Sequence, residues 1–471
     1  GPAGRRSGMA SRRRKAVVGA AVVTAALCSV LIGVGDAEPE RPASQRPTPS
    51  TTRSAPTSAS TTVATSTTTV EPVITAAPVD TVAPTTAPPP NATTAPPPTN
   101  APLATATIRS TARLPWFDPS ASWNRPVSDF GPSAVLQQYA QRLWDFGGGE
   151  APAGTINVAF GDYSVPVYPL SEATTTARAY QTSWAMELYG FGVPLGTKIP
   201  WNPAWRPGTG NDNILAIVDE QTGRAWEIGG VGQLNVNCAN RANVAAAEQN
   251  RDFTSTYLCV GGVRIYDNLF TATDATTVDG RGAGINKLAL LTRADEVKAG
   301  AIRHALQMTV TASMFGPACS PARGTSAPGA GVSCGFFLPP ATKLERINPD
   351  VGCPTSQTVT DAERSKTVPE GMRFALRVSD DEIAQWLDSR GYSGRIRETA
   401  RIFAVALRDY GWIVAETGCW GMHIETDSVI GASGQSWADV GIVSNGSAYP
   451  RGDLLNGLFR PERIYVVEPP G

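Results

Sequence analysis

The chain has 471 residues, and its 40 Lys and Arg against 41 Asp and Glu give a net charge of −1. This length excludes a single small domain, and a hydrophobic content of 41% with 11 Trp excludes disorder throughout the chain. The near-zero charge excludes the basic excess that nucleic-acid-binding proteins show. A His-rich metal centre is excluded because the chain has only 2 His. We therefore expect no nucleic-acid partner, no metal and no cofactor.

Residues 1–37 have the composition of an export signal. Six basic residues between Arg5 and Lys15 precede an apolar run from Ala16 to Val34. This run is also long enough to span a bilayer, so a cleaved signal peptide and an N-terminal membrane anchor both remain open. In both cases we expect the rest of the chain to be extracellular, either secreted or tethered to the cell membrane.

Residues 38–112 are predicted to form a disordered stalk. They contain 15 Pro, many Thr, Ser and Ala, and no aromatic residue, since the first aromatic residue is Trp116. Such a segment cannot bury enough apolar surface to offset the entropy cost of ordering. We expect it to be extended, with a reach on the order of 200 Å, and to carry a globular domain over residues 113–471.

The net charge looks different once the export signal is set aside. Residues 1–37 hold 6 of the 40 basic and 1 of the 41 acidic residues, which leaves 34 and 40 in the remainder, a net of −6. This mildly acidic remainder favours neutral glycans over anionic polymers as partners.

The globular domain contains six of the seven cysteines. An even number of cysteines in an exported domain predicts three disulfides. Short loops favour the pairs Cys238 with Cys259 and Cys319 with Cys334, which leaves Cys353 with Cys419. Other connectivities remain open because spacing alone does not decide the pairing.

Apolar residues at helical spacing predict a helix over residues 133–144. Residues 213–219 and 224–228 predict a β-hairpin, whose alternation puts Trp226 on one face and Glu227 on the other. A sequence resembling a capping box over residues 292–295 predicts a helix that leads toward residues 304–306.

The C-terminal third of the domain has the clearest helix signals. A capping box over residues 379–382 predicts a helix that Gly391 ends, and the run over residues 395–410 predicts a helix that Gly411 ends. Residues 412–418 and 421–427 then read as two paired strands. With many Gly, Pro, Asn and Thr between the elements, we expect a mainly β fold, a large antiparallel β-sandwich of jelly-roll type with a few flanking helices.

Several short motifs, taken in this order, resemble a family of largely uncharacterised exported bacterial and fungal proteins. The motifs are Ser122-Trp123-Asn124, Ala225-Trp226-Glu227, Asp295-Glu296-Val297, and the runs over residues 300–306, 371–376 and 410–416. The resemblance covers most of the chain from Trp116 to about Asp427. It implies a shared fold and a set of positions, but no established activity. The substrate-binding positions that it implies are Trp123, Asn124, His304 and Arg373.

The chain departs from the pattern of this family at two positions. Relatives often have D-x-H before the first hairpin strand, where this chain has Asp212-Asn213. They often have Asp where this chain has Glu416.

Paired carboxylates are the most economical chemistry for this chain. Glycoside cleavage needs one acid that protonates the leaving oxygen and a second carboxylate that acts as nucleophile or base. Apolar surroundings beside Trp226 would raise the pKa of Glu227, as this acid role requires. Glu416 ends an apolar strand and Asp212 flanks the hairpin, so we predict that Glu227, Glu416 and Asp212 are catalytic. Tryptophan side chains are predicted to stack on sugar rings, namely Trp226, Trp412 and Trp420, together with Trp201 and Trp205.

Other chemistries are less favoured. His423 and Glu425 lie on one strand face and would supply two metal ligands, but a polar strand face is the simpler interpretation. A Ser-His-Asp triad needs a placed serine nucleophile, and a serine hydrolase is less favoured than paired carboxylates. Two functions therefore stay open: an exported glycoside hydrolase acting on polysaccharide or cell-wall glycan, and a non-catalytic wall-binding or adhesion protein on a long stalk. The sequence does not indicate an oligomeric state.

Overall fold

The computed structural model describes residues 116–149, 151–181, 193–194, 196–210, 212–231, 257–273, 282–314, 334–344, 360–418 and 421–470. The chain divides into two units, Gly1–Thr99 and Asn100–Gly471, and every described residue belongs to the second. The predicted export segment and stalk therefore lie outside the described residues. No helix within the described ranges combines the length and the apolar composition needed to cross a bilayer.

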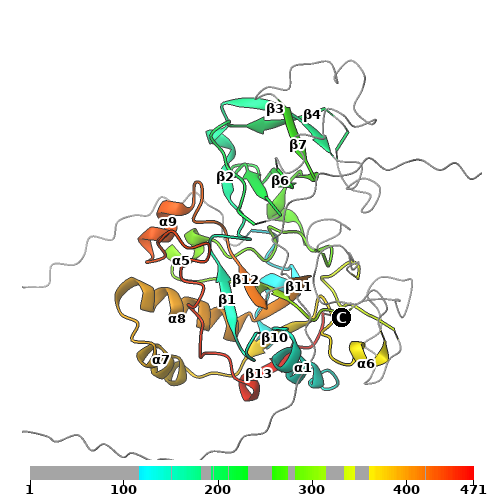
Figure 1. Ribbon diagram of the computed structural model, residues 1–471, viewed down its shortest axis with the longest axis vertical. Helices are drawn as coiled ribbons and strands as arrows, with labels where there is room; N and C mark the ends of the chain where they lie inside the picture. The colour runs from blue at the N-terminus through cyan, green and yellow to red at the C-terminus, as the bar shows by residue number, and fades with distance from the viewer. Residues whose placement is uncertain are drawn as a thin grey trace, which may run out of the picture. The chain divides into compact units, whose positions relative to one another are not determined.

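The described strands form three sheets (Figure 1). The six-stranded sheet has the order β1 (Ile156–Ala159), β12 (Met422–Glu425), β9 (Leu306–Val310), β11 (Trp412–Thr417), β10 (Arg373–Leu376) and β13 (Ile464–Val466). The four-stranded sheet has the order β2 (Val167–Pro169), β5 (Leu215–Val218), β6 (Ala225–Gly229) and β8 (Gly262–Tyr266). The three-stranded sheet has the order β4 (Thr197–Trp201), β3 (Thr175–Gln181) and β7 (Tyr257–Val260).

The three sheets confirm the expectation of a mainly β fold. The expectation of an antiparallel fold is wrong, because the sheets contain both parallel and antiparallel strand pairs. Four strand pairs are parallel: β1 with β12, β9 with β11, β2 with β5, and β3 with β7. Parallel neighbours need long crossover connections, and the helices between β9 and β11 provide one. The predicted pairing of residues 412–418 with 421–427 is also wrong, because β9 lies between β11 and β12 and pairs with both. The predicted hairpin is confirmed as β5 and β6.

The helix predicted over residues 133–144 begins only at Gln138. The described helices agree with the capping signals in part. They are α1 (Gln138–Phe146), α5 (Ala294–Lys298), α6 (Asp361–Arg364), α7 (Asp380–Ser389), α8 (Gly394–Asp409) and α9 (Gly434–Asp439). Ser379 and Glu382 form the predicted reciprocal capping box of α7. The helix expected to run from residue 292 toward 306 ends at Lys298, and Leu306 begins β9 instead. Gly300 has a φ of 92°, a left-handed conformation that breaks the helix after α5.

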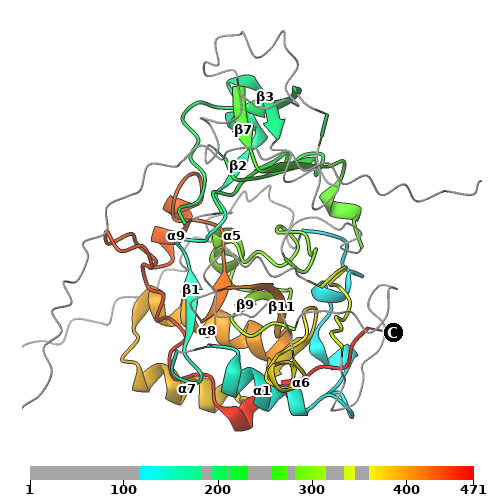
Figure 2. The same cartoon turned by 45° about the vertical axis from the view of Figure 1, so that its right-hand side comes forward.

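Three large apolar cores lie between the layers of the described elements. One face of the six-stranded sheet packs against α1, α7 and α8 through side chains such as Trp412 and Val414. Figure 2, turned from Figure 1, shows α7 and α8 side by side. The opposite face, through Ile413 and Ala415, shares a second core with the four-stranded sheet and residues 283–291. A third core lies between the four-stranded and three-stranded sheets and includes Trp226.

Candidate functional site

Glu227 lies in the middle of β6 and is 6% exposed. As the alternation predicts, Trp226 points into the third core and Ala225 into the second. The Glu227 carboxylate oxygen Oε2 accepts hydrogen bonds from the Tyr266 hydroxyl and from the backbone N–H of Lys287, both at 3.2 Å. A buried carboxylate requires such donors, and here they come from β8 and from the segment that precedes α5.

Lys287 joins Glu227 to Glu416. Its Nζ lies 3.5 Å from Oε2 of Glu416, and the two side chains are 10% and 21% exposed. The segment that carries Lys287 is fixed beside β11 because the N–H of Ala283 donates to the carbonyl of Ala415 at 3.2 Å. The structure thus brings two of the three predicted catalytic carboxylates to one lysine.

A β-bulge determines where Glu416 points. Along β11, Trp412 and Val414 face the helix-covered core, so strict alternation would send Glu416 there as well. The pairing of β11 with β9 shifts between Val414 and Glu416, so that Ala415 and Glu416 together oppose a single position of β9. The bulge therefore turns Glu416 onto the face of Ala415, where Lys287 lies.

Asp212 lies away from this pair. It is exposed, and its backbone carbonyl accepts a hydrogen bond from Gly230 at 2.8 Å. Ala216 is the cross-strand partner of Glu227, so Asp212 is four residues, roughly 13 Å, further along that chain segment. This separation does not fit the predicted role of Asp212 as the carboxylate partner of Glu227.

The described tryptophans predicted to bind substrate or to stack on sugars are core residues. Trp123 and Trp412 are 0% exposed, and Trp412 stacks on Phe374 with 5.9 Å between ring centroids. Trp226 is buried under the guanidinium of Arg224. Trp201 and Trp205 are also buried, in edge-to-face contact with each other. A sugar would reach these rings only if the cores opened, so the predicted stacking role does not fit them. Trp420 lies outside the described residues.

Asn124 and His304 make internal hydrogen bonds. Nδ2 of Asn124 donates to the carbonyls of Trp116 and Asp118 at 2.9 and 3.0 Å. The buried His304 ring lies between the Ala305 carbonyl, 2.8 Å from Nδ1, and Oε2 of Glu296, 3.2 Å from Nε2. Burial alone would raise the pKa of Glu296, but His304 and other donors hold it below its usual value. The polar atoms of Asn124 and His304 are therefore bonded to other residues of the protein, which does not fit their predicted role in substrate binding.

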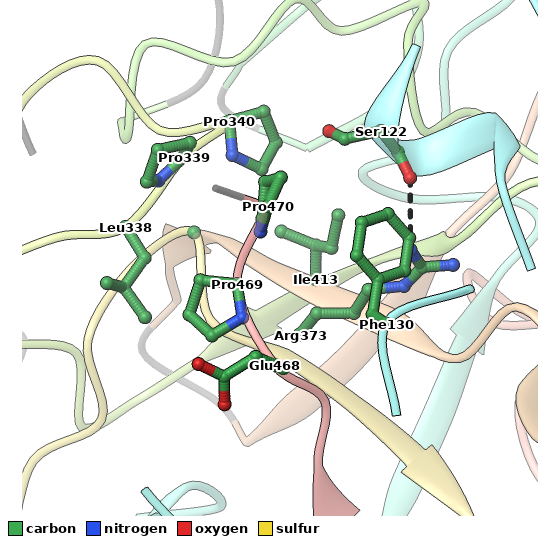
Figure 3. Close-up of a pocket in the computed structure, with 11 residues that line it drawn as sticks. Ser122, Phe130, Leu338, Pro339, Pro340, Arg373, Ile413, Glu468, Pro469 and Pro470 are labelled. Carbon is green, nitrogen blue, oxygen red and sulfur yellow. Dashed lines mark hydrogen bonds between the residues drawn. The ribbon is translucent and has the colours of Figure 1, made fainter. Parts of the chain in front are cut away.

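Arg373 lines a small pocket near the C-terminus (Figure 3). Its guanidinium donates to the carbonyls of Ser122, Arg125 and Tyr410 at distances between 2.6 and 3.0 Å. Burial lowers its pKa to about 10, and the guanidinium stays charged at neutral pH. Figure 3 shows four prolines in the wall of the pocket, Pro339, Pro340, Pro469 and Pro470, together with Phe130, Leu338, Ile413 and Glu468. The cavity volume of about 10 Å³ holds a single water and is too small for a sugar.

Of the six cysteines in the domain, Cys334 is the one whose side chain the structure describes. Cys334 forms a disulfide, and its partner is not among the described side chains. The side chains of Cys238, Cys259, Cys319, Cys353 and Cys419 lie outside the described part, so the connectivity stays a prediction. Within the described ranges, no three His, Cys, Asp or Glu side chains gather in a group suited to a metal ion.

Sequence reasoning missed Lys287 and Tyr266. Lys287 follows the glycine-rich segment over residues 280–284, which reads as a turn and gives no sign that it meets two other elements. Tyr266 ends β8, next to Glu227 on β6, a pairing that connects residues about 40 positions apart. These contacts depend on long-range packing and have no local signal in the sequence.

No protein-family model, curated protein or solved structure matches the chain. The family resemblance of the motifs therefore stays an expectation, and the site is interpreted from its own geometry.

Proposed function

We propose that this chain is an exported, carbohydrate-directed protein that hydrolyses a glycan with Glu416 and Glu227 as its carboxylate pair. The observation that carries the proposal is the contact of both carboxylates with one residue, Lys287. Glu227 and Glu416 belong to different sheets and both contact Lys287, and glycoside hydrolysis is a reaction that uses two carboxylates without a cofactor.

The environments of the two carboxylates support different roles. Glu416 is the more exposed, and the Lys287 ammonium compensates its negative charge, which suits a nucleophile or a base. Glu227 is more deeply buried, which favours the protonated form that a proton donor needs, and two hydrogen bonds at Oε2 hold the carboxyl group in place. In the proposed reaction Glu227 protonates the leaving oxygen while Glu416 attacks the anomeric carbon or activates water.

The proposal also covers the export signal, the stalk, the sandwich fold and the disulfides. We propose that the N-terminal segment exports or anchors the chain and that the stalk holds the domain at the wall, its partner being a wall polysaccharide. A jelly-roll-like sandwich is supported by the core that the four-stranded and three-stranded sheets share. The three predicted disulfides are supported by the disulfide at Cys334.

The proposal is tested by measuring reducing ends released from wall polysaccharides. We expect Glu416→Gln and Glu227→Gln to lower the rate about 10²–10⁴-fold while the thermal melting curves remain cooperative. Asp439→Asn is the matched control, since Asp439 pairs with Lys298 at the surface at 2.7 Å. Equal release by the wild type and Glu416→Gln would overturn the catalytic role. Binding of polysaccharide with no release by any form would favour the wall-binding alternative.

A further inference from the structure

Four polar residues form one row across the six-stranded sheet. Asn157 of β1 is the partner of His423 on β12, His423 is the partner of Thr309 on β9, and Thr309 is the partner of Glu416 on β11. Neighbouring strands lie about 4.8 Å apart, so the row extends over roughly 14 Å. One end of the row is Glu416, which the proposed function already assigns to the active site.

The side chains of the row point away from the helix-covered core. Asn157, His423 and Thr309 each lie between two residues of that core along their strands. Because side chains alternate between the faces of a strand, all three project from the opposite face. The bulge in β11 adds Glu416 to the same face. All four residues are partly exposed, so a ligand reaches them without opening a core.

The hydrogen bond of His423 determines which of its ring nitrogens is available. Nδ1 lies 3.2 Å from the carbonyl of Gly421, and a carbonyl only accepts, so the proton is on Nδ1. Nε2 then carries a lone pair and has no hydrogen-bond partner among the described residues. Burial lowers the pKa of His423, although the Gly421 carbonyl acts against this shift, and the ring is neutral at pH 7.

Among the residues that the structure describes, four side chains surround His423 or share its face. Glu425 shares its strand face, and Thr309 and Asn157 flank it on the neighbouring strands. Tyr449, from the loop over residues 443–450, has its ring centroid 6.3 Å from that of His423. Glu416 is two strands away, where Lys287 balances its charge. No fixed positive charge therefore belongs to the row, which argues against an anionic ligand.

We propose that the row Asn157–His423–Thr309–Glu416 is a binding surface for the hydroxyl groups of a neutral glycan, with Nε2 of His423 accepting a hydroxyl hydrogen bond. An amide, an imidazole, a hydroxyl and a carboxylate together offer the donors and acceptors that hydroxyl groups require. The inference deepens the proposed function and rests on it for the identity of Glu416 as the reacting end. A glycan along the row would present one of its linkages to Glu416.

The first test uses the fact that the chain has only 2 His. Diethyl pyrocarbonate acylates an unprotonated, accessible imidazole nitrogen, so we expect His423 to react, while His304 is protected by partners at both ring nitrogens. Nitrogen-15 spectra of the histidine rings are expected to show Nδ1–H at His423. Reaction of His304 alone, or a proton on Nε2 of His423, would overturn the proposal.

The second test separates binding from hydrolysis. Neutral oligosaccharides from partial acid hydrolysis of wall polysaccharides serve as the probe, with Glu227→Gln, which lies outside the row, as the non-hydrolysing background. We expect them to slow acylation of His423, and we expect His423→Ala to raise their Kd about tenfold, the effect of an unpaired polar group. Thr309→Val and Asn157→Ala give smaller increases, and Asp439→Asn gives none.

The outcomes distinguish the two proposals. Protection of His423 without any release of reducing ends refutes the hydrolase and leaves the binding surface intact. Release of reducing ends with a KM unchanged in both His423→Ala and Asn157→Ala refutes the binding surface and leaves the hydrolase. Absence of both protection and release refutes both.

Discussion

The Asp427 carboxylate accepts a hydrogen bond from the backbone N–H of Ala294 at 3.0 Å, although only 3% of Asp427 is exposed. It thereby connects the end of β12 to the first turn of α5. Burial raises the pKa of Asp427 to about 7, and Asp295 adds to this effect. The hydroxyl of Ser433, the Ala294 N–H and the positive charge of Arg293 act in the opposite direction and do not cancel it.

This raised pKa predicts that stability falls as the pH rises from about 4 through 7. In that window the folded protein keeps a proton on Asp427 that the unfolded chain releases, so raising the pH favours unfolding. A shift from 3.8 to about 7 corresponds to roughly 4 kcal/mol across the window. We expect Asp427→Asn to remove this slope, as measured by urea unfolding at several pH values. Asp439→Asn, at an exposed acid, should keep it, and an unchanged slope in Asp427→Asn would contradict the prediction.

The ion pair of Lys287 with Glu416 predicts a measurable loss of stability in Lys287→Met. Removal of the ammonium takes one favourable ion pair from a partly buried carboxylate, which we expect to cost about 1–3 kcal/mol. Lys298→Met is the matched control, because its pair with Asp439 is exposed and contributes below about 1 kcal/mol. Urea midpoints at a constant m-value measure both. Equal, small effects in the two variants would show that Lys287 contributes only through its backbone N–H.

Local signals in the sequence predicted the elements but not the site. The capping box at Ser379, the end of α8 before Gly411 and the β5–β6 hairpin all depend on residues within a few positions of each other. The strand order depends on long-range packing, so the parallel pairs and the insertion of β9 between β11 and β12 had no local signal.

The residues of the candidate site were likewise predicted only where a local pattern determines them. The hairpin alternation gave the correct face for Glu227, but the bulge that turns Glu416 toward Lys287 is a register shift against β9 and leaves no pattern in β11 itself. Tryptophan composition was misleading, because Trp226 and Trp412 suit a core as well as a sugar platform. Burial, which distinguishes the two, follows only from the packed structure.

Complete burial of Trp412 predicts that Trp412→Ala destabilises the domain by about 3–5 kcal/mol. The ring stacks on Phe374 and meets Phe459 edge-on at 5.1 Å, so its removal leaves a cavity at the centre of the helix-covered core. Val135→Ala, at a side chain that is 65% exposed, is the control and should change stability by less than about 0.5 kcal/mol. A normal melting temperature in Trp412→Ala with loss of glycan binding would restore the platform interpretation.

Two glycines that follow helices allow a matched test of backbone conformation and close packing. Gly391 after α7 and Gly411 after α8 have φ values of 64° and 69°, so alanine is strained at both by about 1–2 kcal/mol. A Cβ at Gly391 meets no atom within 4 Å, whereas a Cβ at Gly411 would collide with the backbone carbonyl of Phe374. That carbonyl belongs to β10, the strand that pairs with β11, and it cannot withdraw without disturbing the sheet.

We therefore expect Gly391→Ala to lose only the conformational cost of about 1–2 kcal/mol. Gly411→Ala should lose this amount and the cost of the collision, so that it unfolds at a clearly lower urea concentration or accumulates as insoluble protein. Urea midpoints and the soluble fraction of each variant provide the comparison. Equal midpoints for the two variants would mean that β10 and β11 tolerate separation at this point, which contradicts the close approach of Gly411 to Phe374 in the fold.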